Sequence, residues 1–317
     1  MEHPFASRLP GGPPERAASG RGGEIGRRSF LTSGASLAAG LLAAGAASGM
    51  VRPFPLRAQE AGHAPSARTV QWLRTAFSFQ ISVDVATLEH GLRVARAALA
   101  GGANIVEMGT PLLKNAGVSN VVPAFRQTFP EALLLADMKT MDGGAFEARA
   151  VYAGGGNIID FLALAGVDTA KAICAVRDEF RRTHPELPRL AFADILVPHE
   201  APAPQAAAVA RRMLQAGVDG VGVHLQADAR RADPKLVETD YLVDVARAIF
   251  EQVGDAAPVQ VVGGLSAAQA TRLARAGLRA FVISGNLGQP DSRARYDLPD
   301  EEIQRHVAGF IASVSRV

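Results

Sequence analysis

Short apolar runs alternate with amphipathic stretches along most of the chain. Eight of these runs are rich in β-branched and other apolar residues and predict strands, at residues 77–84, 103–108, 132–137, 157–164, 189–196, 218–224, 259–264 and 279–285. The stretches between them carry apolar residues at helical spacing, at residues 86–100, 144–154, 167–182, 204–217 and 266–277. Strands that alternate with helices favour a parallel sheet, and eight strands are the number that closes a barrel. The pattern therefore predicts an α/β fold, a (β/α)8 TIM barrel in a single domain.

Glycines at four predicted helix ends support this architecture. The chain reads AGGAN, AGGGN, AGVDG and AGLRA at residues 100–104, 153–157, 216–220 and 276–280. Each segment places glycine where a left-handed cap ends a helix just before the next strand. A doubly wound open sheet is the competing architecture, but it requires a glycine-rich phosphate turn after the first strand. Residues 82–91 contain no such turn, so the barrel is favoured.

The first part of the chain resembles an export signal. Arg27 and Arg28 precede an apolar stretch of Ala, Gly and Leu that carries no charge until Arg52. This arrangement is similar to a twin-arginine signal, which would direct the folded protein to the periplasm or another extracytoplasmic space. The alternative is a disordered tail with one short transmembrane helix, although a bilayer requires roughly 20 apolar residues. If the segment is not a working signal, the protein is expected to stay in the cytoplasm.

Signal cleavage would follow Ala46 or Ala58, and the sequence does not distinguish these sites. We therefore assign residues 1–66 to a twin-arginine-type signal and linker and residues 67–317 to the catalytic barrel. We expect no stable membrane insertion of the mature chain.

Charge and cysteine content narrow the functional classes. Residues 1–58 hold seven Arg and three Glu, which leaves 26 basic and 28 acidic residues in the remainder. This near-neutral body offers no basic surface for nucleic acid. Cys174 is the only cysteine in the sequence, which excludes an intramolecular disulfide and a cysteine-based zinc site.

Charged residues follow the predicted strands one after another, as expected for an active site at the carboxyl ends of barrel strands. These residues are Asp84, Glu107, Asp137, Lys139, Asp194 and His224. Residues two apart in a strand share a face, so Asp137 and Lys139 are expected to point together into the barrel mouth. Glu107 lies among apolar neighbours, where an unpaired carboxylate is costly, and we expect Lys139 or a metal ion as its partner. Taken singly, each of these residues also fits a surface salt bridge or a structural role.

Three motifs carry a family resemblance. They read VEMGTPLLKNAG at 106–117, ADMKTMDGG at 136–144 and GVGVH at 220–224. In this order they resemble the decarboxylase and aldolase branch of the orotidine 5'-phosphate decarboxylase superfamily, which contains 3-hexulose-6-phosphate synthase and 3-keto-L-gulonate-6-phosphate decarboxylase. The resemblance spans about residues 77–288. True orotidylate decarboxylases carry a lysine where Glu107 stands and act without metal, so the resemblance implies Mg²⁺ and argues against orotidylate as substrate.

The resemblance also implies roles for single residues. Glu107 and Asp137 would bind Mg²⁺, and Lys139, held in place by Asp84, would supply a second positive charge to a 1,2-enediolate. His224 would transfer a proton as general base or acid. Asp142 would reach across a homodimer interface into the site of the neighbouring subunit.

A phosphate group of the substrate is expected at the last two strands, a frequent phosphate site in such barrels. The candidate contacts are the backbone N–H groups of Gly263, Gly264, Gly285 and Asn286. Glycine pairs are also common loop residues. The family often has an arginine or a small residue where Asn286 stands, so retention of a phosphate on the ligand is open.

The choice within the branch depends on few residues. The motif KTMDGG at 139–144 is more similar to the synthase, and the decarboxylase has an arginine where Ala227 stands. The sequence therefore predicts an Mg²⁺-dependent aldehyde-lyase that joins ribulose 5-phosphate and formaldehyde, or catalyses the reverse. A carboxy-lyase acting on 3-keto-L-gulonate 6-phosphate is the alternative. Residues 224–240 read as a long charged loop that leaves the substrate preference open. An exported barrel that only binds a sugar or sugar phosphate is the second alternative.

Overall fold

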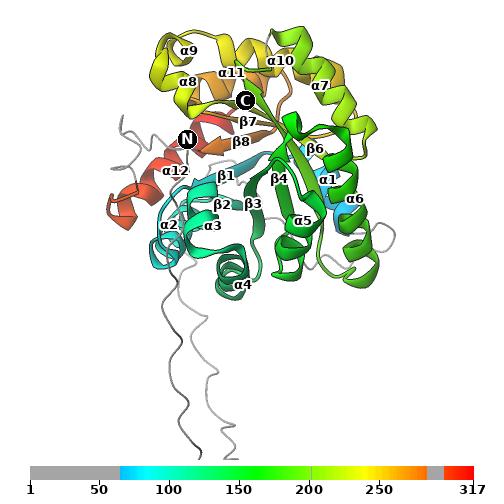
Figure 1. Cartoon of the computed structure of the whole chain (residues 1–317). Coiled ribbons are helices and arrows are strands. Elements are labelled where there is room, and N and C mark those ends of the chain that lie inside the picture. The colour runs from blue at the N-terminus through cyan, green and yellow to red at the C-terminus, as the bar shows by residue number, and fades with distance from the viewer. Residues whose placement is uncertain (1–64, 201, 284–295) are drawn as a thin grey trace, which may run out of the picture. The chain divides into compact units, whose positions relative to one another are not determined.

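Eight parallel strands form a closed barrel in the strand order β1-β2-β3-β4-β5-β6-β7-β8 (Figure 1). The computed structural model describes residues 65–200, 202–283 and 296–317. The strands are β1 Ser78–Val83, β2 Ile105–Met108, β3 Leu133–Thr140, β4 Ile158–Leu162, β5 Leu190–Val197, β6 Gly220–Leu225, β7 Val259–Val262 and β8 Ala280–Ile283. Every neighbouring pair is parallel, and β8 pairs with β1 to close the barrel. The predicted (β/α)8 barrel is confirmed.

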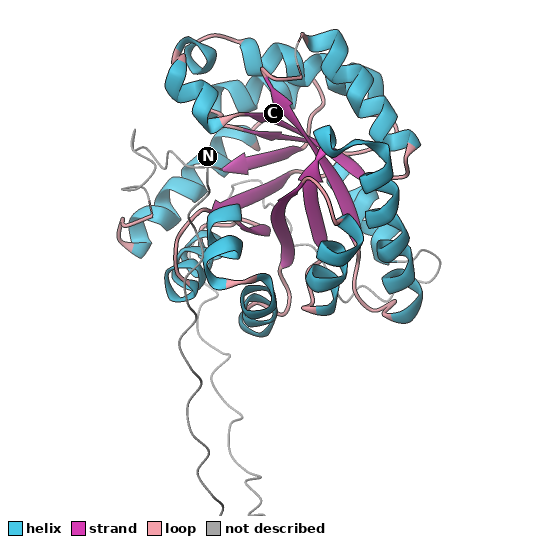
Figure 2. Cartoon of the chain, viewed as in Figure 1, coloured by secondary structure: helices cyan, strands magenta, loops and turns pink. Residues whose placement is uncertain are grey.

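Helices surround the strands, as Figure 2 shows. They are α1 Pro65–Thr75, α2 Leu88–Ala100, α3 Thr110–Ala116, α4 Val118–Thr128, α5 Gly144–Ala153, α6 Gly166–Thr183, α7 Ala203–Gln215, α8 Ala227–Ala232, α9 Lys235–Glu238, α10 Tyr241–Val253, α11 Ala267–Arg275 and α12 Asp300–Val314, with a 3-10 turn at Ala163–Ala165. The segment 224–240, read from the sequence as a long charged loop, instead contains α8 and α9. Both helices are short, so the spacing of their charged residues does not show a helical period in the sequence.

The glycine caps have the predicted backbone geometry. Gly102, Gly155, Gly217 and Gly277 have φ values of 102°, 95°, 100° and 107°. An L-residue with a side chain rarely adopts this conformation, so glycine stops each helix at a fixed position and turns the chain toward the following strand.

Two apolar clusters hold the barrel together. The larger one lies between the outer face of the strands and the helices, with side chains such as Val106, Leu134 and Ile159 fully buried. The smaller one fills the barrel interior near the strand starts, where Leu133, Ile158 and Leu190 meet Leu73 from α1. Helix α1 therefore packs against the amino-terminal end of the barrel, opposite the end where the charged residues gather.

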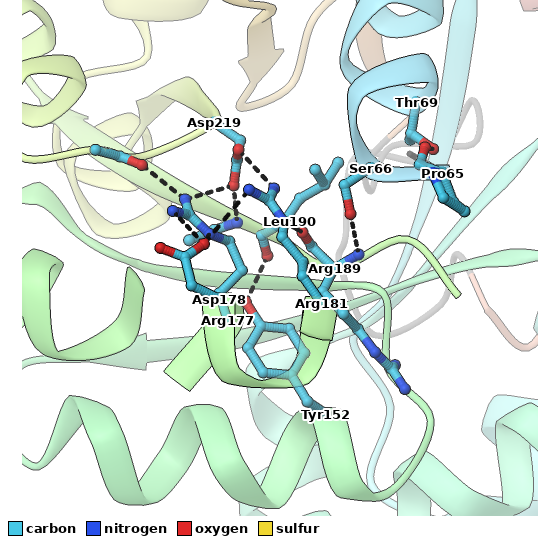
Figure 3. A network of polar contacts seen from close by, with 12 residues as sticks. Pro65, Ser66, Thr69, Tyr152, Arg177, Asp178, Arg181, Arg189, Leu190 and Asp219 are labelled. Atoms are coloured by element: carbon cyan, nitrogen blue, oxygen red, sulfur yellow. Dashed lines mark hydrogen bonds and ion pairs between the residues drawn. The ribbon is translucent and has the colours of Figure 1, made fainter. Parts of the chain in front are cut away.

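A polar network reinforces the same amino-terminal end (Figure 3). Arg177 and Arg181 of α6 both pair with Asp219, at 2.8 and 2.7 Å, and the Asp219 carboxylate also accepts from the backbone N–H of Ala191. The guanidinium of Arg189 lies 5.8 Å from the centres of the Tyr152 and Phe180 rings. These contacts join α6 to the starts of β5 and β6.

The expected signal segment, with its possible cleavage sites after Ala46 and Ala58, lies outside the described residues apart from its last two positions. Residues 65 and 66 begin α1, and Ser66 accepts a hydrogen bond from the backbone N–H of Arg189. Among the helices that the structure describes, none combines the length and the apolar character needed to cross a membrane.

Candidate active site

One cavity of about 780 Å³ opens at the carboxyl ends of the strands. Asp84, Glu107, Asp137, Lys139 and His224, the residues that the sequence singles out at strand ends, all line it. They come from β2, β3, β6 and the end of β1, and parallel closure of the barrel brings these strand ends to a common mouth.

Lys139 lies at the centre of the charged groups because the backbone of β3 is irregular there. The pairing register between β3 and β4 shifts between Asp137 and Thr140, and Lys139 has a φ of 49°, in the left-handed region. Its ammonium group contacts the Asp137 carboxylate and lies 3.1 Å from Oδ2 of Asp194. Both β3 residues thus face the cavity, but through a bulge and not through the regular alternation that the sequence suggested.

The expected pairing of Lys139 with Asp84 is not observed. Within the described part of the chain, the ion pairs of Lys139 go to Asp137 and Asp194, whereas Asp84 accepts a hydrogen bond from Ser82 at 2.9 Å. Burial lowers the pKa of Lys139, but the carboxylates of Asp137 and Asp194 outweigh this effect and hold the pKa well above its usual value. The bulge directs Lys139 toward Asp194 of β5, and these two carboxylates favour the charged form of the partly buried lysine.

Glu107 is a buried carboxylate in an environment that disfavours its charge. One of its oxygens accepts a hydrogen bond from Gln80, which accepts in turn from Gln260 at 2.6 Å. The Ser82 hydroxyl lies 2.9 Å from both Glu107 and Asp84, so these two carboxyl groups share its single proton. Burial, followed by repulsion from Asp137 and Asp84, raises its pKa well above the usual range. A bound cation would remove this penalty.

His224 is oriented by a second buried carboxylate. Its Nδ1 lies 2.8 Å from Oδ2 of Asp194, a side chain that is 1% exposed. Burial raises the pKa of Asp194, but Lys139 and His224 outweigh it and hold the pKa well below its ordinary value. The carboxylate therefore stays charged and can only accept, so Nδ1 carries the proton and Nε2 is the ring atom left for chemistry.

Asp160 on β4 is a further buried acid at this end of the barrel. It is the register partner of Asp137, and within residues 65–200, 202–283 and 296–317 its Oδ1 has no hydrogen-bond partner. Burial, together with the charge of Asp194, raises its pKa well above the usual value. Counted over the described residues, the mouth of the barrel thus holds more carboxyl groups than cations.

The residues present are compatible with Mg²⁺ at Glu107 and Asp137. Two buried carboxylates face one cavity and repel each other, and Mg²⁺ typically takes one or two carboxylates and completes its shell with water and substrate oxygens. Among the residues that the structure describes, no group of three or more His, Cys, Asp or Glu side chains could hold a metal ion by itself. Water or substrate oxygens would have to complete the coordination.

Not every predicted residue joins the cavity. Asp142 is exposed and accepts from the backbone N–H of Gly143 at 2.7 Å. Gly263 lines the cavity, whereas Gly264 lines a neighbouring shallow pocket. Gly285 and Asn286 lie outside the described residues.

Sequence reasoning missed several residues of the site. Asp194 was noted at a strand end but received no role, and Asp160, Gln80 and Arg230 were not singled out. Alternation along residues 80–84 places Gln80, Ser82 and Asp84 on one face and could have revealed the first of them. Asp160 interrupts an apolar run, which is a similar signal. Arg230 lies three residues beyond the position where the decarboxylase has its arginine and gives no pattern of its own.

Known proteins resemble this chain in sequence and in fold. Residues 78–272 match the model of the family "Orotidine 5'-phosphate decarboxylase / HUMPS family". The chain is 34% identical over 90 residues to 3-hexulose-6-phosphate synthase from Mycobacterium gastri, covering 28% of this chain and 42% of that protein. It is also 34% identical over 77 residues to the synthase from Methylomonas aminofaciens, covering 24% of this chain and 36% of the relative. The aligned parts thus span less than half the length of these relatives.

Solved structures share the fold. A 3-hexulose-6-phosphate synthase superposes with a TM-score of 0.58 at 23% identity, covering 72% of this chain and 99% of that one. KGPDC from Streptococcus mutans gives a TM-score of 0.56 at 20% identity, covering 77% of this chain and 99% of that one. At these identities the likeness concerns the fold.

Proposed function

Because this chain belongs to the orotidine 5'-phosphate decarboxylase / HUMPS family, we propose that it is an Mg²⁺-dependent lyase of the aldolase type. In this proposal it joins ribulose 5-phosphate to formaldehyde through a 1,2-enediolate, or catalyses the reverse cleavage. The observation that carries the proposal is the convergence of Asp84, Glu107, Asp137, Lys139 and His224 on one cavity. An enediolate is an anion, and a preorganised, partly buried cation such as Lys139 stabilises it more than water does.

Proton transfer is assigned to His224. A base removes the proton from the carbon next to the ketone, the enediolate carbon attacks formaldehyde, and the new alkoxide takes up a proton. Nε2 of His224 suits these transfers because Nδ1 is engaged by Asp194 at 2.8 Å. The charged Asp194 stabilises the imidazolium while the proton resides on the ring.

Electrostatic stabilisation is assigned to Lys139. Its raised pKa keeps the ammonium charged while an oxyanion develops on the substrate. Mg²⁺ held by Glu107 and Asp137 would supply further positive charge to the substrate oxygens. Asp84, fixed by Ser82, would orient a substrate hydroxyl through hydrogen bonding.

A carboxy-lyase acting on 3-keto-L-gulonate 6-phosphate is the second candidate. Ala227 stands where the decarboxylase has an arginine, which favours the aldolase. However, the Arg230 side chain lines the cavity one helical turn later and provides a guanidinium on the same side. Loss of carbon dioxide would use the same enediolate and the same cation.

A homodimer that shares Asp142 between subunits is also proposed. Asp142 lies outside the cavity of its own chain. Exposed apolar side chains flank it on the segments after the neighbouring strands β3 and β4, namely Met141, Phe146, Leu164 and Val167, with Phe146 82% exposed. Large exposed apolar side chains next to a charged residue are typical of a protein interface.

Export by the twin-arginine route is proposed from residues 26–50. An exported barrel would encounter other ligands than cytoplasmic sugar phosphates, so a barrel that only binds such a ligand is the third candidate. Fractionation of cells that express the full chain, with and without an Arg27→Lys and Arg28→Lys change, tests the export proposal.

The decisive experiment incubates the full chain with Mg²⁺ and either ribulose 5-phosphate plus formaldehyde or 3-keto-L-gulonate 6-phosphate. Formation of a hexulose phosphate supports the aldolase, and release of carbon dioxide supports the decarboxylase. Ligand binding without turnover, unchanged in Asp137→Ala and Lys139→Ala, would support a binding protein and contradict the proposed lyase.

A further inference from the structure

Tyr296 joins the segment that leads into α12 to the end of β1. Its side chain is 2% exposed, and its hydroxyl donates a hydrogen bond to the backbone carbonyl of Ser82. Both residues line the cavity of the candidate active site. The two residues are 214 positions apart in the sequence, so this contact exists only because the barrel closes.

The Ser82 carbonyl points toward β8. The carbonyl of the next residue, Val83, accepts from the backbone N–H of Gly109 beside β2 at 3.1 Å. Successive carbonyls alternate between the two edges of a strand, so the Ser82 carbonyl faces the other neighbour, β8. The described pairing of β1 with β8 extends as far as Ile81. The Tyr296 hydroxyl therefore holds β1 just beyond this point.

Helix α2 fixes the backbone of Tyr296. The Tyr296 carbonyl oxygen accepts from the guanidinium of Arg93 and lies 2.8 Å from Nε2 of His90. Arg93 also donates to the carbonyl of Leu298 at 3.1 Å and pairs with Asp300 at 2.5 Å. Because these contacts hold the main chain, the tyrosine ring reaches β1 from a fixed position.

Ser82 connects this contact to the carboxylates of the cavity. Its hydroxyl lies 2.9 Å from an oxygen of Glu107 and 2.9 Å from an oxygen of Asp84. The carbonyl that Tyr296 holds and the hydroxyl that faces the carboxylates belong to one residue, so a shift of its backbone would displace both. Groups that orient a metal ligand from outside the coordination shell typically change metal affinity by about 10-fold to 100-fold when they are lost.

We infer that Tyr296 is a positioning residue for the carboxylate of Glu107 and acts through the backbone and the hydroxyl of Ser82. The inference rests on the proposed function in that Glu107 and Asp137 bind Mg²⁺. It goes further by assigning an effect on metal affinity to a residue of the connection between β8 and α12.

Tyr152 provides a matched control. Its side chain is 1% exposed, and its hydroxyl donates to the backbone carbonyl of Leu190, at the start of β5, at 2.8 Å. A change to Phe removes the same kind of hydrogen bond at either tyrosine and keeps the ring. Leu190 belongs to the apolar cluster at the amino-terminal end of the barrel, so only the change at Tyr296 is expected to affect the metal.

The test measures Mg²⁺ binding by calorimetry on the full-length protein without substrate. Tyr296→Phe is expected to weaken Mg²⁺ binding by about threefold to tenfold, the usual effect of one neutral hydrogen bond. Ser82→Ala removes the group next to the carboxylates and should weaken binding by about tenfold or more. Tyr152→Phe should leave the Mg²⁺ affinity unchanged. In the Ser82→Ala background, Tyr296→Phe should cause no further loss, because both changes act on the same group.

The outcomes separate this inference from the proposed activity. Equal Mg²⁺ affinity in the wild type and in Tyr296→Phe overturns the inference even if the protein is an active lyase. An equal loss in Tyr152→Phe, or an additive loss in the double variant, overturns it as well. A loss of Mg²⁺ affinity in Tyr296→Phe but not in Tyr152→Phe supports it even if the protein has no lyase activity. A wild type that does not bind Mg²⁺ overturns both the inference and the proposed metal site.

Thermal melting of both tyrosine variants checks that they fold. Should Tyr296→Phe fail to fold, Ser82→Ala decides, because an unchanged Mg²⁺ affinity in that variant overturns the inference and a reduced one supports it.

Discussion

The two ends of the barrel both contain buried charges, but they use them differently. At the amino-terminal end, one carboxylate, Asp219, meets Arg177 and Arg181 and also a backbone N–H. At the carboxyl-terminal end, one ammonium, Lys139, meets Asp137 and Asp194. Here one buried carboxyl oxygen each of Asp160 and Asp194 has no hydrogen-bond partner among the residues that the structure describes.

The difference separates a structural network from the network that we propose to be reactive. The Asp219 network joins α6 to β5 and β6. Each of the two carboxylate oxygens of Asp219 accepts a hydrogen bond from one arginine, Arg177 or Arg181. In the described part of the chain, the mouth has more acidic than basic groups, a lysine with a left-handed backbone conformation and two carboxyl groups, Glu107 and Asp160, whose pKa values are raised. Each of these features costs stability unless a ligand or metal is bound. Buried charge is therefore present at both ends, and the imbalance of charge is what sets the proposed active site apart from the structural network.

The largest effect is expected for Lys139→Ala. In the described part of the chain, Lys139 is the only cation that pairs with both Asp137 and Asp194. Its loss should lower kcat/KM by a factor on the order of 10²–10³. The measurement is steady-state kinetics with the substrate found by the proposed assay. Lys171→Ala removes an exposed lysine from α6 and should leave the rate unchanged. A kcat/KM of Lys139→Ala similar to that of the wild type would contradict the proposed difference between the two ends of the barrel.

Asp219→Ala is expected to act on stability and not on chemistry. It leaves Arg177 and Arg181 without their shared carboxylate, which should lower the free energy of unfolding by about 3 kcal/mol. Urea denaturation measures the loss, and kcat at a temperature where the variant is folded should equal that of the wild type.

Cys174 reports on the same end of the barrel. It is buried, and burial raises the pKa of its thiol to about 11, so a thiol reagent should modify it slowly in the wild type. Asp219→Ala should accelerate the modification, while Asp142→Ala should not. Fast labelling of the folded wild type would show that this end is less tightly packed than described.

Mixing two inactive variants tests the shared dimer site. Subunits with Asp142→Ala and subunits with Lys139→Ala, unfolded and refolded together in equal amounts, should recover about a quarter of the wild-type activity. Half of the dimers would then be mixed, and each mixed dimer would contain one intact site. No recovery, with a dimer present by size-exclusion chromatography, would contradict a role for Asp142 in the neighbouring site.

The smallest effect is expected in the pH dependence of stability. The depressed pKa of Asp194 means that its contribution to stability is complete above the unfolded value of about 4 and is lost as pH falls below it. Asp194→Asn lacks this contribution, so urea denaturation between pH 6 and pH 3 should show a smaller loss of stability at low pH than in the wild type. Parallel curves would contradict the assignment of Asp194 as a buried charged acceptor.

Much of the fold could be read from the sequence because its signals are local. The eight strands appear as short apolar runs, and Gly102, Gly155, Gly217 and Gly277 take the left-handed conformation that their positions predict. The gathering of Asp84, Glu107, Asp137, Lys139 and His224 follows from strand polarity, since parallel strands carry their carboxyl ends to one side.

Other features depend on contacts between distant segments. The sequence does not encode a visible signal for the bulge at Lys139, because a bulge depends on the register of β3 against β4. The pairing of Lys139 with Asp194 instead of Asp84 follows from that bulge. The place of Arg230 over Gly264 depends on how α8 packs after β6.

The sequence by itself determined the barrel, the end of it that carries chemistry and the types of side chain available there. The tertiary structure decided which of these charges meet and which ring nitrogen of His224 contacts Asp194. Periodicity and turn residues act over a few neighbouring positions, and the chain pattern records them. The energies of buried charges depend on distances between strands and on exclusion of water, and only the folded chain defines those.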